Sequence, residues 1–561
     1  MSPQMDLVIF EENKPFILQS FRNGDFDYID AASEVFESDF FQFIEAKTIL
    51  KELAQNYPTP RKKEDVPLWF YVASNISMRL HGVHSFNAFP MVVRCGGMLN
   101  VFGPKAGRKV THPDTGDVTI LCEGFNKKNH YDRQTPCDQD FLRKMAKDTD
   151  AQALMRWFCE DVVRMFGRRR AFHKEGIFIG DASYLFVPDN SNYEGSVKLL
   201  FDENNHPLSQ EEFERMRDEQ KVRCQWRRCY KMVTLLHTNP TLDFFLFVAL
   251  KVVSGKDHEC PVLYELVKKF VEVMGKGVMK RLIVDRGFLD GEAISMCKEQ
   301  YGIDILIPVR RKMDIYQDAM ALFGQPDVKW FCCKEPVKEA KDLPRLRPKV
   351  IVKREKKRQK KIRNRKQDNQ SPLPEKTIVK KEAAVIGGFC SWSSCTVPLS
   401  VIANREQYAD GHEQIWLLID TQQVQDPCQA RQDYHQRISI EERYRQLKCF
   451  IDLSHFTSPA FSMIVNQVVF IMLTYNLLQL YLLKKGRREL NQTTLPRVRQ
   501  QLLPSDNHVI VYSQNYYALF TPVELVEFLV TLGEEARNKI AKKCRRLRLE
   551  LNGVMRNPRP P

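Results

Sequence analysis

Residues 281–285 have the sequence RLIVD, a short apolar run that ends in an acidic residue. The same pattern occurs at residues 177–181, which read IFIGD. Between these two runs, strand-like stretches at 231–236 and 244–253 are followed by a helical pattern at 262–273. The two acid-terminated runs therefore bracket a segment with its own regular order of strands and helix.

A helical pattern over about 290–300 and an apolar run at 303–309 continue the series. The order is three strands, a helix, a strand, a helix and a strand. Parallel neighbours need helical crossovers and nearly continuous apolar strands. The order therefore predicts an α/β fold in which a mixed sheet carries helices on its faces.

The rest of the chain is divided around this core. The predicted parts are a mainly helical N-terminal domain at 1–150, a first core segment at 151–310, a β-rich insertion at 311–428, a second core segment at 429–485, and a basic helical C-terminal region at 486–561. Within the insertion, residues 345–366 hold 13 Lys or Arg and one acid. This run either clamps DNA phosphates or is a solvated segment.

Composition limits the class of function. The 561 residues include 85 Lys plus Arg and 70 Asp plus Glu, so the formal net charge is +15, which favours a polyanionic partner such as nucleic acid. We expect no signal peptide, and therefore reduced cysteines; their spacing argues against structural zinc. The apolar stretch 463–483 contains polar residues and is predicted to be a buried helix, so no membrane contact is expected.

Asp181 and Asp285 each end an apolar strand, where side chains of neighbouring strands can meet at one sheet edge. Two such carboxylates suit Mg²⁺, which prefers oxygen ligands and binds through one or two carboxylates together with substrate phosphates. The alternative is that each acid only caps a helix or turn. Asp420, at the end of another apolar strand, has the same ambiguity.

A third element lies at residues 434–448, which read YHQRISIEERYRQLK and are predicted to form one helix. At about 100° per residue, one stripe around Glu441 would carry Tyr434, Arg437, Arg445 and Lys448. Ile440 and Leu447 fall off this stripe and are available for packing. The alternative is a solvated face with Arg–Glu pairs four residues apart.

These motifs resemble the DDE transposases of bacterial insertion sequences, specifically the insertion-sequence-four group. The signature Tyr-x2-Arg-x3-Glu-x6-Lys is met by Tyr434, Arg437, Glu441 and Lys448. Residues 282–288 look like the family's second-Asp strand, and residues 179–183 look like its first. The resemblance extends over about residues 172–483.

The resemblance implies a ribonuclease-H-like core, interrupted by the β-rich insertion, in which Asp181, Asp285 and Glu441 bind two Mg²⁺ ions, or Mn²⁺ in their place. It also implies that Tyr434, Arg437 and Lys448 contact the DNA end. Arg445 joins these DNA contacts from its place on the stripe. Trp416 either stacks on an unpaired base, as an insertion-domain tryptophan does in relatives, or packs in the core.

The implied function is a transposase that binds terminal inverted repeats through its N-terminal domain and catalyses strand cleavage and strand transfer. Double-stranded DNA, a homodimer and a bacterial cytoplasmic, nucleoid-associated location are expected with it. No nucleotide cofactor is expected, because the sequence lacks GxxxxGK[ST]. Two alternatives remain open: a nuclease on the same core without strand transfer, and an inactive DNA-binding derivative.

Overall fold

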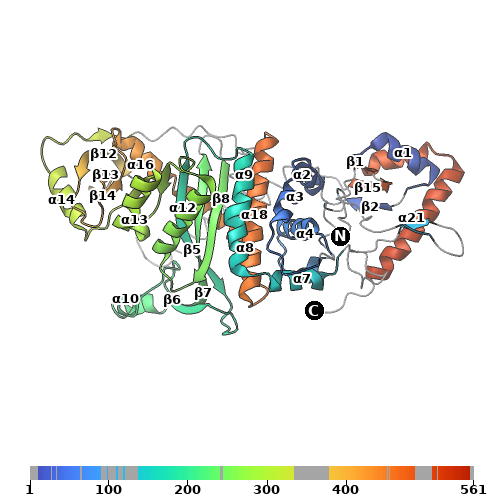
Figure 1. Cartoon of the computed structure of the whole chain (residues 1–561), viewed down its shortest axis with the longest axis horizontal. Helices are drawn as coiled ribbons and strands as arrows, with labels where there is room; N and C mark the ends of the chain where they lie inside the picture. Colours follow the sequence, from blue (N-terminus) through green and yellow to red (C-terminus); the bar gives the residue numbers. More distant parts are fainter. Residues whose placement is uncertain are drawn as a thin grey trace. The chain divides into compact units, whose positions relative to one another are not determined.

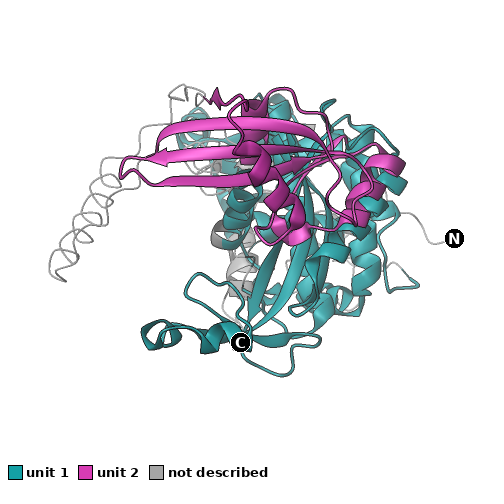
Figure 2. Ribbon diagram, turned by 90° about the vertical axis from the view of Figure 1, so that its left-hand side faces the viewer, with its two compact units in different colours: residues 1–279, 438–561 teal, residues 280–437 magenta. Residues whose placement is uncertain are grey.

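The computed structural model describes residues 11–89, 137–239, 244–333, 378–486 and 508–555, apart from 27, 33–34, 64–65, 452, 454 and 515, together with short pieces at 92, 98, 101, 109–111 and 118–120. The chain forms two compact units (Figure 2). Unit 1 comprises residues 1–279 and 438–561, and unit 2 comprises residues 280–437. The basic segment 345–366 lies outside the described residues.

The main sheet of unit 1 is antiparallel. Its long central strand β7 (Gln225–Asn239) pairs with β5 (Ile177–Val187) on one side and with β8 (Phe244–Ser254) on the other (Figure 1). A short strand, β6 (Val197–Phe201), pairs with the start of β7. β7 is buried from Cys229 to its end, and this buried part includes polar residues, among them Lys231, Thr234 and His237.

Helices cover this sheet. α12 (Glu259–Met274) packs on β7 and β8, and α8 (Ala151–Trp157), α9 (Val163–Arg168) and α18 (Phe461–Lys484) lie beside β8 (Figure 1). α18 is the one described helix that is long and apolar enough to cross a membrane, but 83% of its most apolar window is buried inside the protein. It is the buried helix that the sequence predicts.

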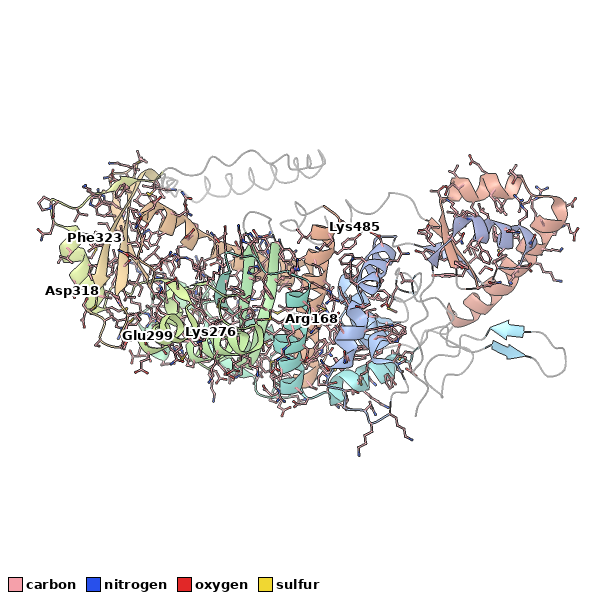
Figure 3. The ribbon with its side chains drawn as sticks, turned by 45° about the horizontal axis from the view of Figure 1, so that its top comes forward. Arg168, Lys276, Glu299, Asp318, Phe323 and Lys485 are labelled. Carbon is pink, nitrogen blue, oxygen red and sulfur yellow. A yellow bond between two sulfur atoms is a disulfide. The ribbon has the colours of Figure 1, made fainter. Side chains whose placement is uncertain are left out.

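The N-terminal helices of unit 1 pack near α18 and α9. They are α2 (Val35–Ala46), α3 (Ile49–Gln55), α4 (Leu68–Leu80) and α7 (Gln139–Asp148). Arg168 and Arg169, at the end of α9, both bind the Glu52 carboxylate of α3 at 2.7 Å (Figure 3). Lys485, just after α18, pairs with Asp39 of α2 at 2.8 Å. Ion pairs thus join segments that lie far apart in the sequence.

The two ends of the chain share one small sheet, in the order β1-β16-β15-β2. Its strands are β1 (Glu11–Glu12), β2 (Tyr28–Ala32), β15 (His508–Ser513) and β16 (Tyr516–Phe520), with helices α1 (Lys14–Asn23), α20 (Pro522–Val530) and α21 (Glu534–Met555). Ile17 and Phe21 of α1 share a core cluster with Val511 and Phe520. This differs from the predicted organisation, in which residues 1–150 and 486–561 are separate and the C-terminal region is helical.

Unit 2 contains a mixed sheet in the order β11-β12-β13-β14-β10-β9. The strands are β9 (Arg281–Ile283), β10 (Asp304–Pro308), β11 (Phe331–Cys332), β12 (Ile378–Phe389), β13 (Leu399–Tyr408) and β14 (Glu413–Asp420). β9 and β10 are parallel and joined by α13 (Gly291–Met296), whereas the other pairs are antiparallel. β14 pairs with β10, so the strands of the predicted insertion continue the sheet of β9 and β10.

The fold is mixed α/β, as predicted. One expectation about the cysteines is wrong, because Cys333 and Cys428 form a disulfide. These residues are 95 positions apart in the sequence, but β11 and the start of α16 (Pro427–His435) bring their Cα atoms to 5.3 Å. Sequence spacing alone gives no sign of such a pairing.

Candidate active site

Asp181 lies in the middle of β5, opposite Thr234 of β7. The prediction that the strand ends at this acid is wrong, because β5 continues to Val187 and pairs with β7 throughout. Phe178 and Ile179 before it are fully buried, while Asp181 itself is half-buried. One of its carboxylate oxygens accepts a hydrogen bond from the backbone N–H of Ala182 at 2.9 Å. The strand therefore anchors the backbone of this acid in the core and leaves the carboxylate accessible to solvent.

Glu441 lies in the first turn of α17 (Ile438–Phe450) and is exposed. Ile440 and Leu447 are fully buried, as expected for residues off the predicted stripe. Arg445 is exposed and binds the carboxylate of Glu442 through two hydrogen bonds of 2.6 and 2.7 Å. The Arg445–Glu442 pair thus matches the alternative prediction of a solvated face with paired charges. Glu441 lies at the accessible start of the same helix.

Two side chains of α17 attach the helix to β5. The Tyr444 hydroxyl donates to the backbone carbonyl of Asp181 at 3.0 Å, and the Lys448 ammonium donates to the Ser183 hydroxyl at 2.6 Å and to the carbonyl of Tyr184 at 2.9 Å. Successive points along α17 therefore contact successive points along β5. This packing brings the helix of Glu441 against the strand of Asp181 within unit 1.

Tyr444 is 6% exposed, and its hydroxyl also lies 2.6 Å from that of Thr234. Burial, and after it the negative charge of Asp181, raises the pKa of Tyr444 well above its ordinary value. The phenol therefore stays protonated and remains a donor at neutral pH. The sequence alone identifies neither Tyr444 nor Thr234 as a site residue. Tyr444 follows Ile440 by four residues and precedes Leu447 by three, a helical spacing that predicts only packing.

Asp285 belongs to unit 2, where it follows β9. Its carboxylate accepts a hydrogen bond from the backbone N–H of Gly287 at 2.7 Å and caps the turn at Arg286–Phe288. The side chain is half-buried. Asp285 therefore does cap a turn, which is the alternative role that the sequence allows. The cap uses one carboxylate oxygen and leaves the side chain half-buried.

The prediction of one continuous helix through residues 434–448 is wrong. α16 ends at His435 and α17 begins at Ile438. At Gln436 and Arg437 the backbone N–H groups bond to carbonyls three residues back, both at 3.0 Å, so the α-helical pattern stops. The connecting residues are polar and Ile438 is 56% exposed, so no continuous apolar stripe supports a single helix here.

Tyr434 and Arg437 consequently lie in unit 2, outside α17. The ring of Tyr434 lies 5.9 Å from that of Trp416 on β14, and the Arg431 guanidinium lies 5.3 Å from the Trp416 ring centre. Trp416 is half-buried, so it packs against neighbours and still presents part of its surface. Asp420 differs from Asp181 and Asp285, since it is fully buried and paired with Arg281 at 2.6 Å.

Asp181, Asp285 and Glu441 all offer carboxylate oxygens that are at least partly accessible, which fits the donor chemistry of Mg²⁺. Two of them belong to unit 1 and one to unit 2. Across the described part of the chain, no group of three or more His, Cys, Asp or Glu side chains stands assembled as a metal site. What fits the ion is the donor type and the accessibility of each carboxylate taken singly.

A half-buried carboxylate in the middle of β5, in an antiparallel sheet flanked by helices and with a glutamate helix packed on the same strand, fits a ribonuclease-H-like transposase domain. Consistent with this class, the family model described as Transposase DDE domain matches residues 196–477, half of the chain. The chain belongs to that family. The matched segment includes Asp285 and Glu441 and begins after Asp181. No curated protein matches the chain.

Proposed function

We propose that this chain is a DNA transposase of the insertion-sequence-four type that cuts the ends of its element and joins them to other DNA. The observation that carries the proposal is the attachment of α17 to β5, which brings Glu441 and Asp181 to one region of unit 1. Family membership supplies the substrate class, since transposases act on DNA.

In this proposal, Asp285 joins Asp181 and Glu441 to hold two Mg²⁺ ions, with Mn²⁺ as a substitute. Bound divalent ions would supply charge stabilisation and activation of the attacking oxygen in phosphodiester chemistry. β5 holds the Asp181 carboxylate, the turn after β9 orients that of Asp285, and α17 presents that of Glu441. Each of the three acids is thus held by its own backbone element.

The proposed reaction has two steps, and each step is an attack on a DNA phosphodiester. Water attacks the phosphodiester at the element's end, breaks the bond to the 3′-oxygen and leaves a 3′-hydroxyl group. That hydroxyl then attacks a second phosphodiester, in the opposite strand or in the target, and releases another 3′-oxygen. The second step conserves the number of phosphodiester bonds, so no nucleotide cofactor is required.

The proposed DNA contacts are cationic and aromatic side chains of the signature and of β14. Arg437, Lys448 and Arg445 would bind phosphates, Tyr434 would donate a hydrogen bond, and the exposed part of Trp416 would stack on a base. Residues 1–150 would bind the terminal repeats, and two copies of the chain would pair the two ends.

Convergence of the three acids can be tested by replacing Mg²⁺ with Fe²⁺ in the full-length protein and adding ascorbate. Radicals formed at a bound iron cut the nearby backbone, so we expect fragments that end near Asp181, Asp285 and Glu441. Asp181→Asn should abolish all of these cuts together, because one shared site generates them. Cuts near Asp181 and Glu441 without any near Asp285 would contradict a site built from three acids.

Activity is tested on a plasmid that carries the gene with its flanking DNA. The wild type should nick this plasmid with Mg²⁺ and give joined products, whereas Asp285→Asn and Glu441→Gln should give neither. The matched controls are Asp290→Asn, which keeps the helix-capping oxygen of α13, and Glu442→Gln, next to Glu441. Nicks without joined products would favour a nuclease over a transposase.

A further inference from the structure

We propose that Tyr444 is a positioning residue, whose hydroxyl group fixes Glu441 relative to Asp181. The inference rests on the proposed function, because it concerns the same acids. Tyr444 lies one turn after Glu441 on α17, and its hydroxyl reaches the backbone of Asp181 itself. A contact made by the helix of one acid to the main chain of another controls the distance between the two.

The direction of the hydrogen bonds follows from the number of protons. A phenol has one proton, and Tyr444 gives it to the Asp181 carbonyl at 3.0 Å. The Thr234 hydroxyl, 2.6 Å from the Tyr444 oxygen, must then be the donor in that pair. Thr234 is fully buried and lies opposite Asp181 in the β5–β7 register. A chain of two hydrogen bonds therefore connects β7, α17 and β5.

The placement of Glu441 depends on this chain. Along a helix that rises about 1.5 Å per residue, Glu441 lies about 4.5 Å before Tyr444, and Lys448 lies about 6 Å after it. Because Lys448 contacts residues 183 and 184, further along β5 than Asp181, the start of α17 points toward the Asp181 end of the strand. Of the two side chains that hydrogen-bond α17 to β5, Tyr444 is thus the one nearer to Glu441.

The affinity for a divalent ion depends on how precisely its ligands are positioned. Mg²⁺ requires nearly ideal octahedral geometry at about 2.0–2.1 Å. Loss of a group that orients a metal ligand typically lowers metal affinity or activity by about 10- to 100-fold. Tyr444→Phe removes the two hydrogen bonds and retains the ring, which packs on Phe247 at 6.3 Å between ring centres.

Unit 1 also provides a matched control on the same ring. Tyr475 of α18 packs against Phe247 at 5.7 Å and is 4% exposed. In the described structure its hydroxyl has no hydrogen-bond partner. Tyr475→Phe therefore removes a buried hydroxyl from the same aromatic cluster without touching Asp181 or Thr234.

The experiment titrates full-length protein with Mn²⁺ and follows the electron paramagnetic resonance signal of the unbound ion. We expect Tyr444→Phe to bind Mn²⁺ about 10- to 100-fold more weakly than wild type, and Tyr475→Phe to bind like wild type. Thr234→Val, which removes the hydroxyl, should also weaken Mn²⁺ binding. Thr234→Ser, which keeps the hydroxyl, should bind Mn²⁺ like wild type. In a Glu441→Gln background, Tyr444→Phe should have no further effect, since a positioning role acts only through Glu441.

Failure of this inference and failure of the proposed function give different results. If wild type binds Mn²⁺, Asp181→Asn abolishes binding, and Tyr444→Phe binds like Tyr475→Phe, the inference is overturned and the proposed function stands. If Asp181→Asn leaves Mn²⁺ binding unchanged, both are overturned. Should Tyr444→Phe not fold, Thr234→Val decides, and wild-type affinity in that variant refutes the positioning role.

Discussion

Asn476 is expected to be the most sensitive polar residue of α18. It is fully buried, accepts a hydrogen bond from the backbone N–H of Phe247 at 2.9 Å, and donates one to the carbonyl of the same residue at 2.7 Å. Among the described strands β8 pairs with β7 alone, on one side, and the register shifts close to Phe247. The Asn476 amide therefore takes the place of a neighbouring strand at this point of β8.

Replacing Asn476 with Leu leaves the N–H and the C=O of Phe247 buried without partners. Each unsatisfied group costs about 1–3 kcal/mol, so the free energy of unfolding of unit 1 should fall by about 2–6 kcal/mol. That is a large part of the roughly 5–15 kcal/mol by which a domain is normally stable. The packing gained by the Leu side chain offsets only part of the loss, because two buried peptide groups are affected.

The measurement is urea unfolding of the full-length protein, combined with hydrogen exchange of peptides from residues 244–254. Asn476→Leu should lower the urea midpoint and speed exchange in β8. Thr474→Val on the same helix is the control, since Thr474 is 1% exposed and its hydroxyl has no partner among the described residues. That control should be neutral or stabilising. Equal midpoints for the two variants would refute the reasoning.

Two further predictions concern other parts of the chain. Burial raises the pKa of Glu45 from 4.5 to about 7, against the opposing charge of Lys51, so the folded state holds the proton more tightly and stability falls as pH rises through that interval. Glu45→Gln should therefore raise the thermal midpoint at about pH 8 and lose most of this advantage at about pH 5; equal gains at both would contradict the assignment. A Cβ atom at Gly291 would lie 2.6 Å from the backbone of Ser394, so Gly291→Ala should cost about 1–3 kcal/mol in urea unfolding. Gly387→Ala, whose Cβ meets nothing closer than 3.9 Å, should be neutral, and a neutral Gly291→Ala would show that the contact can relax.

The order of elements in the core could be predicted because these strands coincide with local apolar runs in the sequence. The runs at 177–181, 244–253 and 281–285 became β5, β8 and β9. The sheet shared by β1, β2, β15 and β16 could not be predicted in this way, since its pairing joins residues about 500 positions apart. A strand of two residues such as β1 has no periodicity to detect.

The candidate site shows the same division between local and distant information. An apolar run followed by an acid indicates Asp181, and a spacing indicates Glu441; both are local patterns, although β5 in fact continues past Asp181. The contact of Tyr444 with the Asp181 carbonyl joins residues 263 positions apart, and the sequence around Tyr444 indicates only that its ring is buried. The break at Gln436 was missed because neither Pro nor Gly marks it.

The break between α16 and α17 changes the physical meaning of the Tyr-x2-Arg-x3-Glu-x6-Lys spacing. The rule of about 100° per residue holds only inside one helix, so it relates Glu441 to Lys448 and does not extend to Tyr434 or Arg437. Seven residues are about two helical turns, which puts Lys448 on the face of Glu441 and lets its ammonium reach Ser183 on the strand of Asp181. The Glu-x6-Lys part of the signature can therefore be explained by a glutamate helix fastened to the first-acid strand at a fixed distance from its acid. The Tyr-x2-Arg part ends the preceding unit and needs a separate explanation, for which contact with DNA is our proposal.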